Sequence, residues 1–233
     1  MTLAAKETRF TVTDRVGSVS ALALKPKKAL AFLVFAHGAG AGMQHNFMET
    51  VARMLGDRDI GSFRYQFPYM EKHTKRPDSQ SVLTATVRAA VSEARKHAGD
   101  LPLFAGGKSM GGRMTSLAMA DAPLEGVAGL VFFGFPLHAA GKPSVDRGEH
   151  LMNIQKPMLF LQGTRDDLAH LNLLEPLCQK LSGANELTNL KLFQEADHSF
   201  HVPARTGRKD ADVRAELLDA FVAWVDRVIA QFS

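Results

Sequence analysis

The sequence is poor in cysteine, with Cys178 the only one among 233 residues. A single cysteine excludes a disulfide within the chain and is typical of a reducing compartment. The first ten residues, MTLAAKETRF, lack the apolar core of a secretory signal, and no apolar run in the chain is long enough to span a bilayer. We therefore expect a cytoplasmic protein without a membrane partner.

The chain also lacks a dense run of basic residues. It has 28 lysines and arginines against 24 aspartates and glutamates, a formal net charge of +4, and the two signs are interspersed. Nucleic-acid-binding segments instead concentrate their basic residues, so we expect no nucleic-acid partner. His198 and His201 have no further histidine or carboxylate at a recognised ligand spacing, so we expect no metal.

Apolar runs of strand length alternate along the chain with helical patterns. The run 29–36 is continuously apolar, which is typical of a strand buried on both faces of a parallel sheet. Apolar residues recur at helical spacing over 218–232, so we expect the final helix to pack on the core. The predicted strands are 10–13, 19–24, 29–36, 61–65, 101–105, 127–133, 158–161 and 190–193, and the predicted helices are 48–56, 79–97, 114–120, 171–181 and 218–232.

The alternation of strands and helices, without an internal repeat or a linker, predicts a single α/β domain over residues 1–233. We expect it to be doubly wound, with a mostly parallel sheet, helices on both faces and no sizeable cap domain. The first two strands are expected to form an antiparallel hairpin at one edge. Asp78 is a candidate cap for the helix over 79–97. Ligands of such sheets bind beyond the carboxyl ends of the strands.

A Gly-x-Ser-x-Gly motif follows the predicted strand 101–105. It reads Gly107-Lys108-Ser109-Met110-Gly111 and leads into the helical pattern over 114–120. Strand, tight turn and helix are the context of a nucleophile elbow, in which the serine has strained backbone angles. Glycine two positions before and after the serine leaves room for this turn. The motif makes Ser109 a candidate nucleophile.

Two nucleotide-binding motifs match this chain only in part. Gly107-Lys108-Ser109 fits the end of a phosphate-binding loop, but the first glycine of that motif would fall at Pro102. Proline lacks the backbone donor and the freedom that a phosphate cradle uses. Gly38-Ala39-Gly40 starts like a dinucleotide fingerprint, but Met43 stands where its last small residue belongs. We expect no organic cofactor.

A base and an acid that could activate Ser109 occur later in the chain. Asp166 follows the strand 158–161, and His198 lies between the last strand and the last helix. The carboxyl ends of parallel strands meet at one edge of a sheet, so the fold would bring these residues to Ser109. Asp167 is the alternative acid, because one of the two aspartates could cap the next helix. For His198, the alternative is a capping or surface histidine.

Acyl transfer also needs backbone N–H groups that stabilise a developing oxyanion. Met110 directly follows the candidate nucleophile, and Ala39 lies in the glycine-rich loop after the strand 29–36, with Gly40 as the alternative. The candidate substrate contacts are His37, Gly38, Lys108 and Tyr69. Tyr69, His73 and Arg76, in the segment Phe67–Arg76, would favour an anionic substrate if that segment faces the acyl pocket. The alternative is that these side chains are solvated loop residues. His138 is either a rim contact or a structural histidine.

Several motifs together resemble the α/β-hydrolase superfamily. They are HGAGAGMQH, FRYQFPY, GGKSMGGRM, FPLHAAGKP, LQGTRD and ADHSF, spread between about residues 29 and 200. More narrowly, the chain resembles the small dienelactone-hydrolase-like group related to the KANL3/Tex-type hydrolase domains. The resemblance implies an esterase-like hydrolase that uses neither a metal nor an organic cofactor. In that superfamily the triad order is serine, acid, histidine, as in Ser109, Asp166 and His198.

The chain departs from dienelactone hydrolase proper at the nucleophile, which is a cysteine there and Ser109 here. We therefore do not expect lactone-diene chemistry. Relatives commonly continue GTRD with Pro-Phe-Gly, whereas this chain has Asp167-Leu168-Ala169, and the choice of acid stays open. We predict a serine hydrolase that cleaves a small ester or thioester through an acyl-enzyme. The alternative is a catalytically silent hydrolase-fold interaction module. The sequence predicts neither the acyl length nor the oligomeric state.

Overall fold

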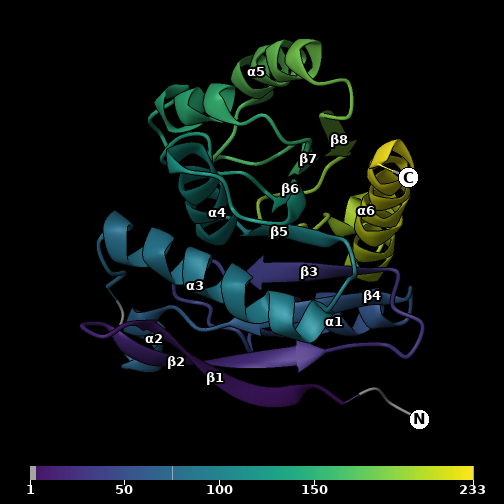
Figure 1. The fold of residues 1–233 in the computed structure, drawn as a ribbon. Coiled ribbons are helices and arrows are strands. Elements are labelled where there is room, and N and C mark those ends of the chain that lie inside the picture. The colour runs from purple at the N-terminus through teal and green to yellow at the C-terminus, as the bar shows by residue number, and fades with distance from the viewer. Residues whose placement is uncertain (1–3, 75, 233) are drawn as a thin grey trace.

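The computed structural model describes residues 4–74 and 76–232 (Figure 1). These residues form one sheet of eight strands in the order β1-β2-β4-β3-β5-β6-β7-β8. The strands are β1 (Lys6–Thr13), β2 (Gly17–Leu24), β3 (Ala31–Ala36), β4 (Ile60–Tyr65), β5 (Leu103–Lys108), β6 (Val127–Phe133), β7 (Met158–Gly163) and β8 (Asn189–Phe193). Strands from β4 to β8 pair in parallel, and the β1–β2 hairpin is antiparallel at one edge. The predicted sheet and edge hairpin are confirmed.

Helices cover both faces of this sheet (Figure 1). In β3, Phe32 and Val34 pack in one apolar cluster while Leu33 and Phe35 pack in the other, because successive strand side chains point to opposite faces. The first cluster includes side chains of α3, α4 and α5, and the second includes side chains of α1 and α6. The doubly wound fold is therefore confirmed. The helices are α1 (Asn46–Gly56), α2 (Pro68–Glu71), α3 (Gln80–Ala98), α4 (Met110–Asp121), α5 (Leu171–Ala184) and α6 (Asp210–Phe232), with the 3₁₀ helices η1 (Asp146–Asn153) and η2 (Ala204–Thr206).

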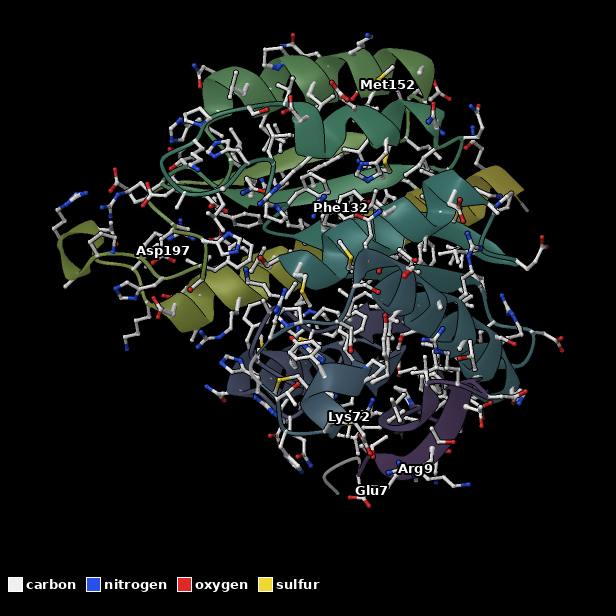
Figure 2. The ribbon with its side chains drawn as sticks, turned by 90° about the vertical axis from the view of Figure 1, so that its left-hand side faces the viewer. Glu7, Arg9, Lys72, Phe132, Met152 and Asp197 are labelled. Atoms are coloured by element: carbon white, nitrogen blue, oxygen red, sulfur yellow. The ribbon has the colours of Figure 1, made fainter. Side chains whose placement is uncertain are left out.

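The final helix packs on the core, as predicted. Trp224 of α6 is fully buried, and its indole N–H donates to the carbonyl oxygen of Leu187 at 2.7 Å. The ring lies against Gly129 of β6, where a Cβ atom would come within 2.6 Å of it. On the other face of β6, Phe132 lies inside the molecule, with its ring 4.8 Å from that of Phe160 (Figure 2). No helix in the described part of the chain combines the length and apolarity needed to cross a bilayer.

The elements around the Gly-x-Ser-x-Gly motif differ from the prediction at their ends. β5 continues through Lys108 and α4 begins at Met110, so a single residue separates strand from helix.

Two further expectations concern Asp78 and the cap domain. The Asp78 carboxylate does not cap α3 but accepts the N–H of Tyr69 at 2.7 Å, because that N–H at the start of the short α2 has no helical partner. Only η1 forms within the β6–β7 connection, so the described residues include no sizeable cap domain.

Candidate active site

Ser109 is the single residue between β5 and α4. Its backbone has φ 51° and ψ −118°, a conformation that residues other than glycine rarely adopt. The neighbouring chain is close on both sides of the turn. A Cβ atom at either Gly107 or Gly111 would lie 2.5 Å from the carbonyl oxygen of Ala36 at the end of β3. The two glycines are thus required sterically, and the turn presents the serine hydroxyl beyond the end of the strand.

The structure brings the predicted base and acid to Ser109. Nε2 of His198 lies 2.8 Å from Oγ of Ser109, and Nδ1 of His198 lies 2.7 Å from Oδ2 of Asp166. A carboxylate only accepts, so Nδ1 carries the ring proton and Nε2 is free to accept the serine proton. The Asp166 side chain is fully buried, whereas Asp167 is exposed. Of the two aspartates, Asp166 is therefore the one that contacts the imidazole.

Gln162, near the end of β7, holds the acid in place and was not identified from the sequence. Its Nε2 donates to Oδ2 of Asp166 at 2.5 Å, and its Oε1 accepts the N–H of Phe135 at 2.8 Å. The other oxygen of Asp166 accepts the N–H of Leu168 at 2.8 Å. The signal in the sequence is a lone polar residue in the otherwise apolar strand MLFLQG. This side chain is fully buried, so its amide is in place only because both of its polar ends are paired.

Lys108 bonds to the backbone of His198. Its Nζ donates to the carbonyl oxygen of His198 at 2.7 Å and lies 5.6 Å from the centroid of the Phe200 ring. Burial lowers the pKa of Lys108 to about 8, against the opposing effect of the charges on Asp166 and Asp197. The ammonium group is therefore engaged within the protein.

His37 and Tyr69, predicted to contact substrate, instead hold the glycine-rich loop. His37 is fully buried, with Nδ1 donating to the carbonyl of Gly38 at 2.7 Å and Nε2 accepting the N–H of Phe67 at 3.1 Å. Burial lowers the pKa of His37 to about 4, so its ring is neutral. The Tyr69 hydroxyl accepts the N–H of Gly40 at 3.0 Å, and burial raises the pKa of this phenol. Both side chains thus use their polar atoms within the protein, and substrate contact by either residue stays a prediction.

The contact with Tyr69 also bears on the predicted oxyanion donors. The N–H of Gly40 is occupied by the phenol oxygen, which leaves Ala39 rather than Gly40 as the candidate in this loop. Ala39 is exposed and borders the same cavity as Ser109. Met110 opens α4, so its N–H is one of the first-turn donors that have no partner within the helix.

A cavity of about 360 Å³ lies beside Ser109 and His198. Gly38 and Lys108 border it, as predicted for substrate contacts, whereas His37 and Tyr69 do not. The lining residues are Gly38, Ala39, Ala41, His45, Phe47, Met48, Lys108, Ser109, Leu168, His198 and Ser199. We call this space the Ser109 cavity.

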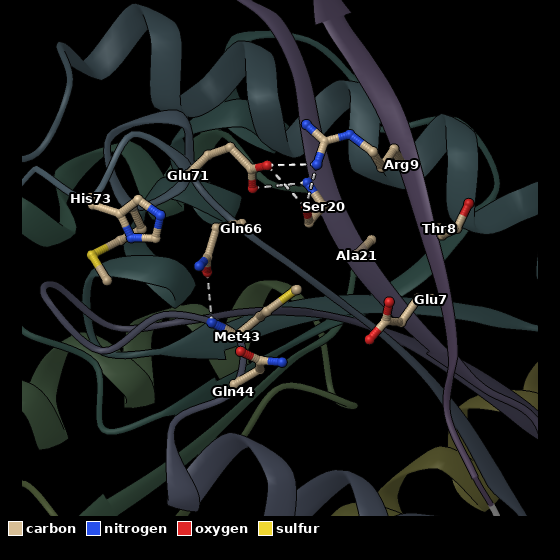
Figure 3. A pocket seen from close by; sticks show the side chains of 11 residues that line it. Glu7, Thr8, Arg9, Ser20, Ala21, Met43, Gln44, Gln66, Glu71 and His73 are labelled. Atoms are coloured by element: carbon tan, nitrogen blue, oxygen red, sulfur yellow. Dashed lines mark hydrogen bonds and ion pairs between the residues drawn. The ribbon is translucent and has the colours of Figure 1, made fainter.

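A second cavity, of about 460 Å³, lies at the β1–β2 edge of the sheet, where Glu7 and Arg9 are found (Figures 2 and 3). His73 borders this second cavity and not the Ser109 cavity. The wall of the second cavity includes an ion pair of 2.7 Å between Arg9 and Glu71, and both side chains also form hydrogen bonds with Ser20. Of the residues expected to favour an anionic substrate, His73 thus faces the second cavity.

The other polar residues considered from the sequence do not border the Ser109 cavity. His138 is buried, with Nδ1 donating to the carbonyl of Ala139 and Nε2 accepting the N–H of His170, each at 3.0 Å. Arg76 is exposed. Asp197 accepts the N–H groups of Ser199 and His201 and so forms a loop turn. Within residues 4–74 and 76–232, no three or more His, Cys, Asp or Glu side chains are grouped to hold a metal ion.

The sheet order, the tight turn at Ser109 and the neighbouring His198 and Asp166 define an α/β-hydrolase. The chain matches the family model described as an alpha/beta hydrolase domain over residues 29–226, and it therefore belongs to that family.

Three solved structures illustrate the likeness in fold. A lidless α/β serine hydrolase from Xanthomonas campestris shares 20% identity, with 95% of each chain covered and a TM-score of 0.70. A dienelactone hydrolase from Anabaena variabilis shares 17% identity, with 96% of this chain and 99% of that chain covered and a TM-score of 0.69. An esterase from Pyrococcus furiosus shares 14% identity, with 97% and 90% covered and a TM-score of 0.71. The predicted superfamily is thus confirmed, and the narrower relation to KANL3/Tex-type domains stays a prediction.

Proposed function

We propose that this protein is a serine hydrolase that cleaves a small ester or thioester through an acyl-enzyme. Ser109 is the nucleophile, His198 the general base and Asp166 the group that orients and stabilises the imidazole. The observation that carries the proposal is the continuous chain of contacts from Oγ of Ser109 through both ring nitrogens of His198 to the buried Asp166 carboxylate, with separations of 2.8 and 2.7 Å.

In the proposed reaction, Nε2 of His198 takes the proton of Ser109 as Oγ attacks the substrate carbonyl carbon. The resulting oxyanion accepts hydrogen bonds from the backbone N–H groups of Met110 and Ala39. When the tetrahedral intermediate collapses, the bond to the alcohol or thiol breaks and the leaving group takes the proton from His198. Water, deprotonated by the same imidazole, then attacks the acyl-enzyme and releases the carboxylic acid and Ser109.

Substitution of Ser109 tests this proposal. Ser109→Ala is expected to lower kcat for 4-nitrophenyl acetate by roughly 10⁴-fold or more, because the acyl-enzyme cannot form. A fluorophosphonate probe is expected to label the wild type and not the Ser109→Ala or His198→Ala variant. Ser199→Ala is the matched control, since Ser199 borders the same cavity but does not contact His198 through its hydroxyl in the described structure. Turnover by Ser109→Ala close to that of the wild type contradicts the proposal.

We further infer that residues 1–233 form one domain and that the protein resides in the cytoplasm. The first inference is supported by the single sheet, to which every described strand belongs. The second is supported by the one cysteine, Cys178, which is free and buried in α5. The proposed partner is a small-molecule ester or thioester.

A further inference from the structure

The Ser109 cavity has no group ready to pair with a charged substituent. Besides His198, the basic side chains that border the cavity among the described residues are Lys108 and His45, and no carboxylate borders it. The Lys108 ammonium is engaged by the carbonyl of His198 and lies over the ring of Phe200. Nδ1 of His45 accepts the N–H of Phe47 at 3.2 Å, so this side chain is engaged in capping the start of α1.

An aromatic ring held on two sides forms part of the wall. Phe47, in the first turn of α1, stacks on Phe200 with ring centroids 6.0 Å apart and an interplanar angle of 13°. Its ring also meets Phe133 edge-on, with centroids 6.2 Å apart. Phe47 is half-buried and borders the cavity with apolar neighbours that include Met48 and Leu168. This part of the cavity wall is thus apolar and partly aromatic.

The volume of the Ser109 cavity indicates the size of the group that fits within its walls. Its 360 Å³ is near the lower end of the range for small-molecule sites. At about 30 Å³ for each water-sized group, it accommodates roughly a dozen such groups. A short acyl group with part of its leaving group fills this space.

We propose that the site takes esters or thioesters with a compact, uncharged, apolar acyl group, and that Phe47 determines this specificity. The inference rests on the proposed function. A carboxylate placed in this cavity would lose part of its hydration without gaining a charged partner, which disfavours binding. A methylene group placed against Phe47 and Met48 is instead transferred out of water, which favours binding.

A pair of esters matched in size tests the charge preference. We compare 4-nitrophenyl butyrate with mono-(4-nitrophenyl) succinate, whose acyl group ends in a carboxylate. The kcat/KM of the butyrate is expected to exceed that of the succinate by about 100-fold, and to exceed that of the acetate by roughly fourfold for each added methylene. Equal or faster cleavage of the succinate overturns the proposal.

A charge placed at Phe47 tests the role of this residue. Phe47→Arg is expected to raise the succinate-to-butyrate ratio of kcat/KM by at least about tenfold, because a cation then borders the cavity. Gln44→Arg is the matched control: it adds the same charge three residues away, where the side chain borders the second cavity (Figure 3). An unchanged ratio in Phe47→Arg, or the same change in both variants, overturns the assignment of Phe47.

Fluorophosphonate labelling separates failure of this inference from failure of the proposed function. If wild-type Ser109 is not labelled and neither ester is cleaved, the proposed function fails and this inference fails with it. If Ser109 is labelled but the enzyme prefers the succinate, or cleaves neither ester, only the assignment of the acyl class fails. Labelling of Phe47→Arg shows that its active site is still folded.

Discussion

The ammonium nitrogen of Lys108 donates a 2.7 Å hydrogen bond to the carbonyl oxygen of His198. Lys108 directly precedes Ser109, so this bond joins the end of β5 to the loop that carries the imidazole. The same loop includes Phe200, which has a positive φ of 63° and lies under the lysine. The serine and the histidine are thus positioned relative to one another by a contact that does not involve either of their reacting atoms.

Lys108→Met keeps the apolar stem of the side chain and removes this bond. We expect kcat to fall roughly tenfold, because small displacements of a catalytic group are costly, while KM for a small neutral ester changes less. Steady-state kinetics with 4-nitrophenyl butyrate measure the effect. Lys180→Met is the control, since Lys180 is an exposed residue of α5. If both variants retain the wild-type kcat, the bond to His198 has no positioning role.

Asp166→Asn is expected to lower kcat by about 10⁴-fold, because an amide at this position favours the wrong tautomer of the base and does not stabilise the imidazolium. Asp167→Asn removes the same charge from the adjacent, exposed residue and is expected to leave kcat within about twofold. Hydrolysis of 4-nitrophenyl acetate by the two variants, measured side by side, makes the comparison. Similar losses in both would contradict the assignment of Asp166 as the acid.

Acid is expected to destabilise the protein through His37. Its pKa is about 4 in the folded state, below the ordinary value of 6.5, because the ring is buried. Between these values the unfolded chain binds the additional proton, so the free energy of unfolding falls as the pH drops from 6.5 toward 4, by on the order of 3 kcal/mol in all. His150, whose pKa burial also lowers to about 4, acts in the same direction.

Urea unfolding at pH 7.0 and pH 4.5 tests this expectation. In His37→Gln, the difference in the free energy of unfolding between the two pH values should be smaller than in the wild type, because one of the two contributing histidines is gone. His73→Gln replaces an exposed histidine at the rim of the second cavity and should keep the full difference. If His37→Gln loses as much stability with acid as the wild type, the buried ring does not cause the effect.

Much of the fold was accessible from the sequence because burial leaves a periodic pattern. The continuous apolar run of β3 predicted a strand covered on both faces, and the helical stripe that includes Phe221 and Val225 predicted a packed final helix. The positions of Ser109, Asp166 and His198 could be predicted because each residue follows a strand whose carboxyl end lies at the same edge of the sheet. The position of each residue after a strand was sufficient for this prediction, without knowledge of the residues that surround it in the fold.

The direction in which each loop side chain points could not be predicted in this way. His37 directly precedes the glycine-rich loop and Tyr69 lies in the segment after β4, but the polar atoms of both face inward to bond backbone groups. Asp166 and Asp167 are neighbours of the same type, and only the local path of the loop makes one buried and the other exposed. The role of Gln162 could not be predicted, because its amide joins Asp166 to Phe135, two residues that are far apart in the chain.

Part of the wall of the Ser109 cavity comes from a stretch of chain that does not carry the proposed catalytic side chains. Five of the lining residues lie between Ala39 and Met48, whereas the contacting side chains of Ser109, Asp166 and His198 come from three later loops. A library confined to this one short stretch could therefore be selected for new acyl groups while the proton pathway is inherited unchanged. Because the proposed oxyanion donor Ala39 acts through its backbone N–H, even a side-chain change at that position would leave the donor in place, so acyl preference and the proposed chemistry can vary separately along this stretch.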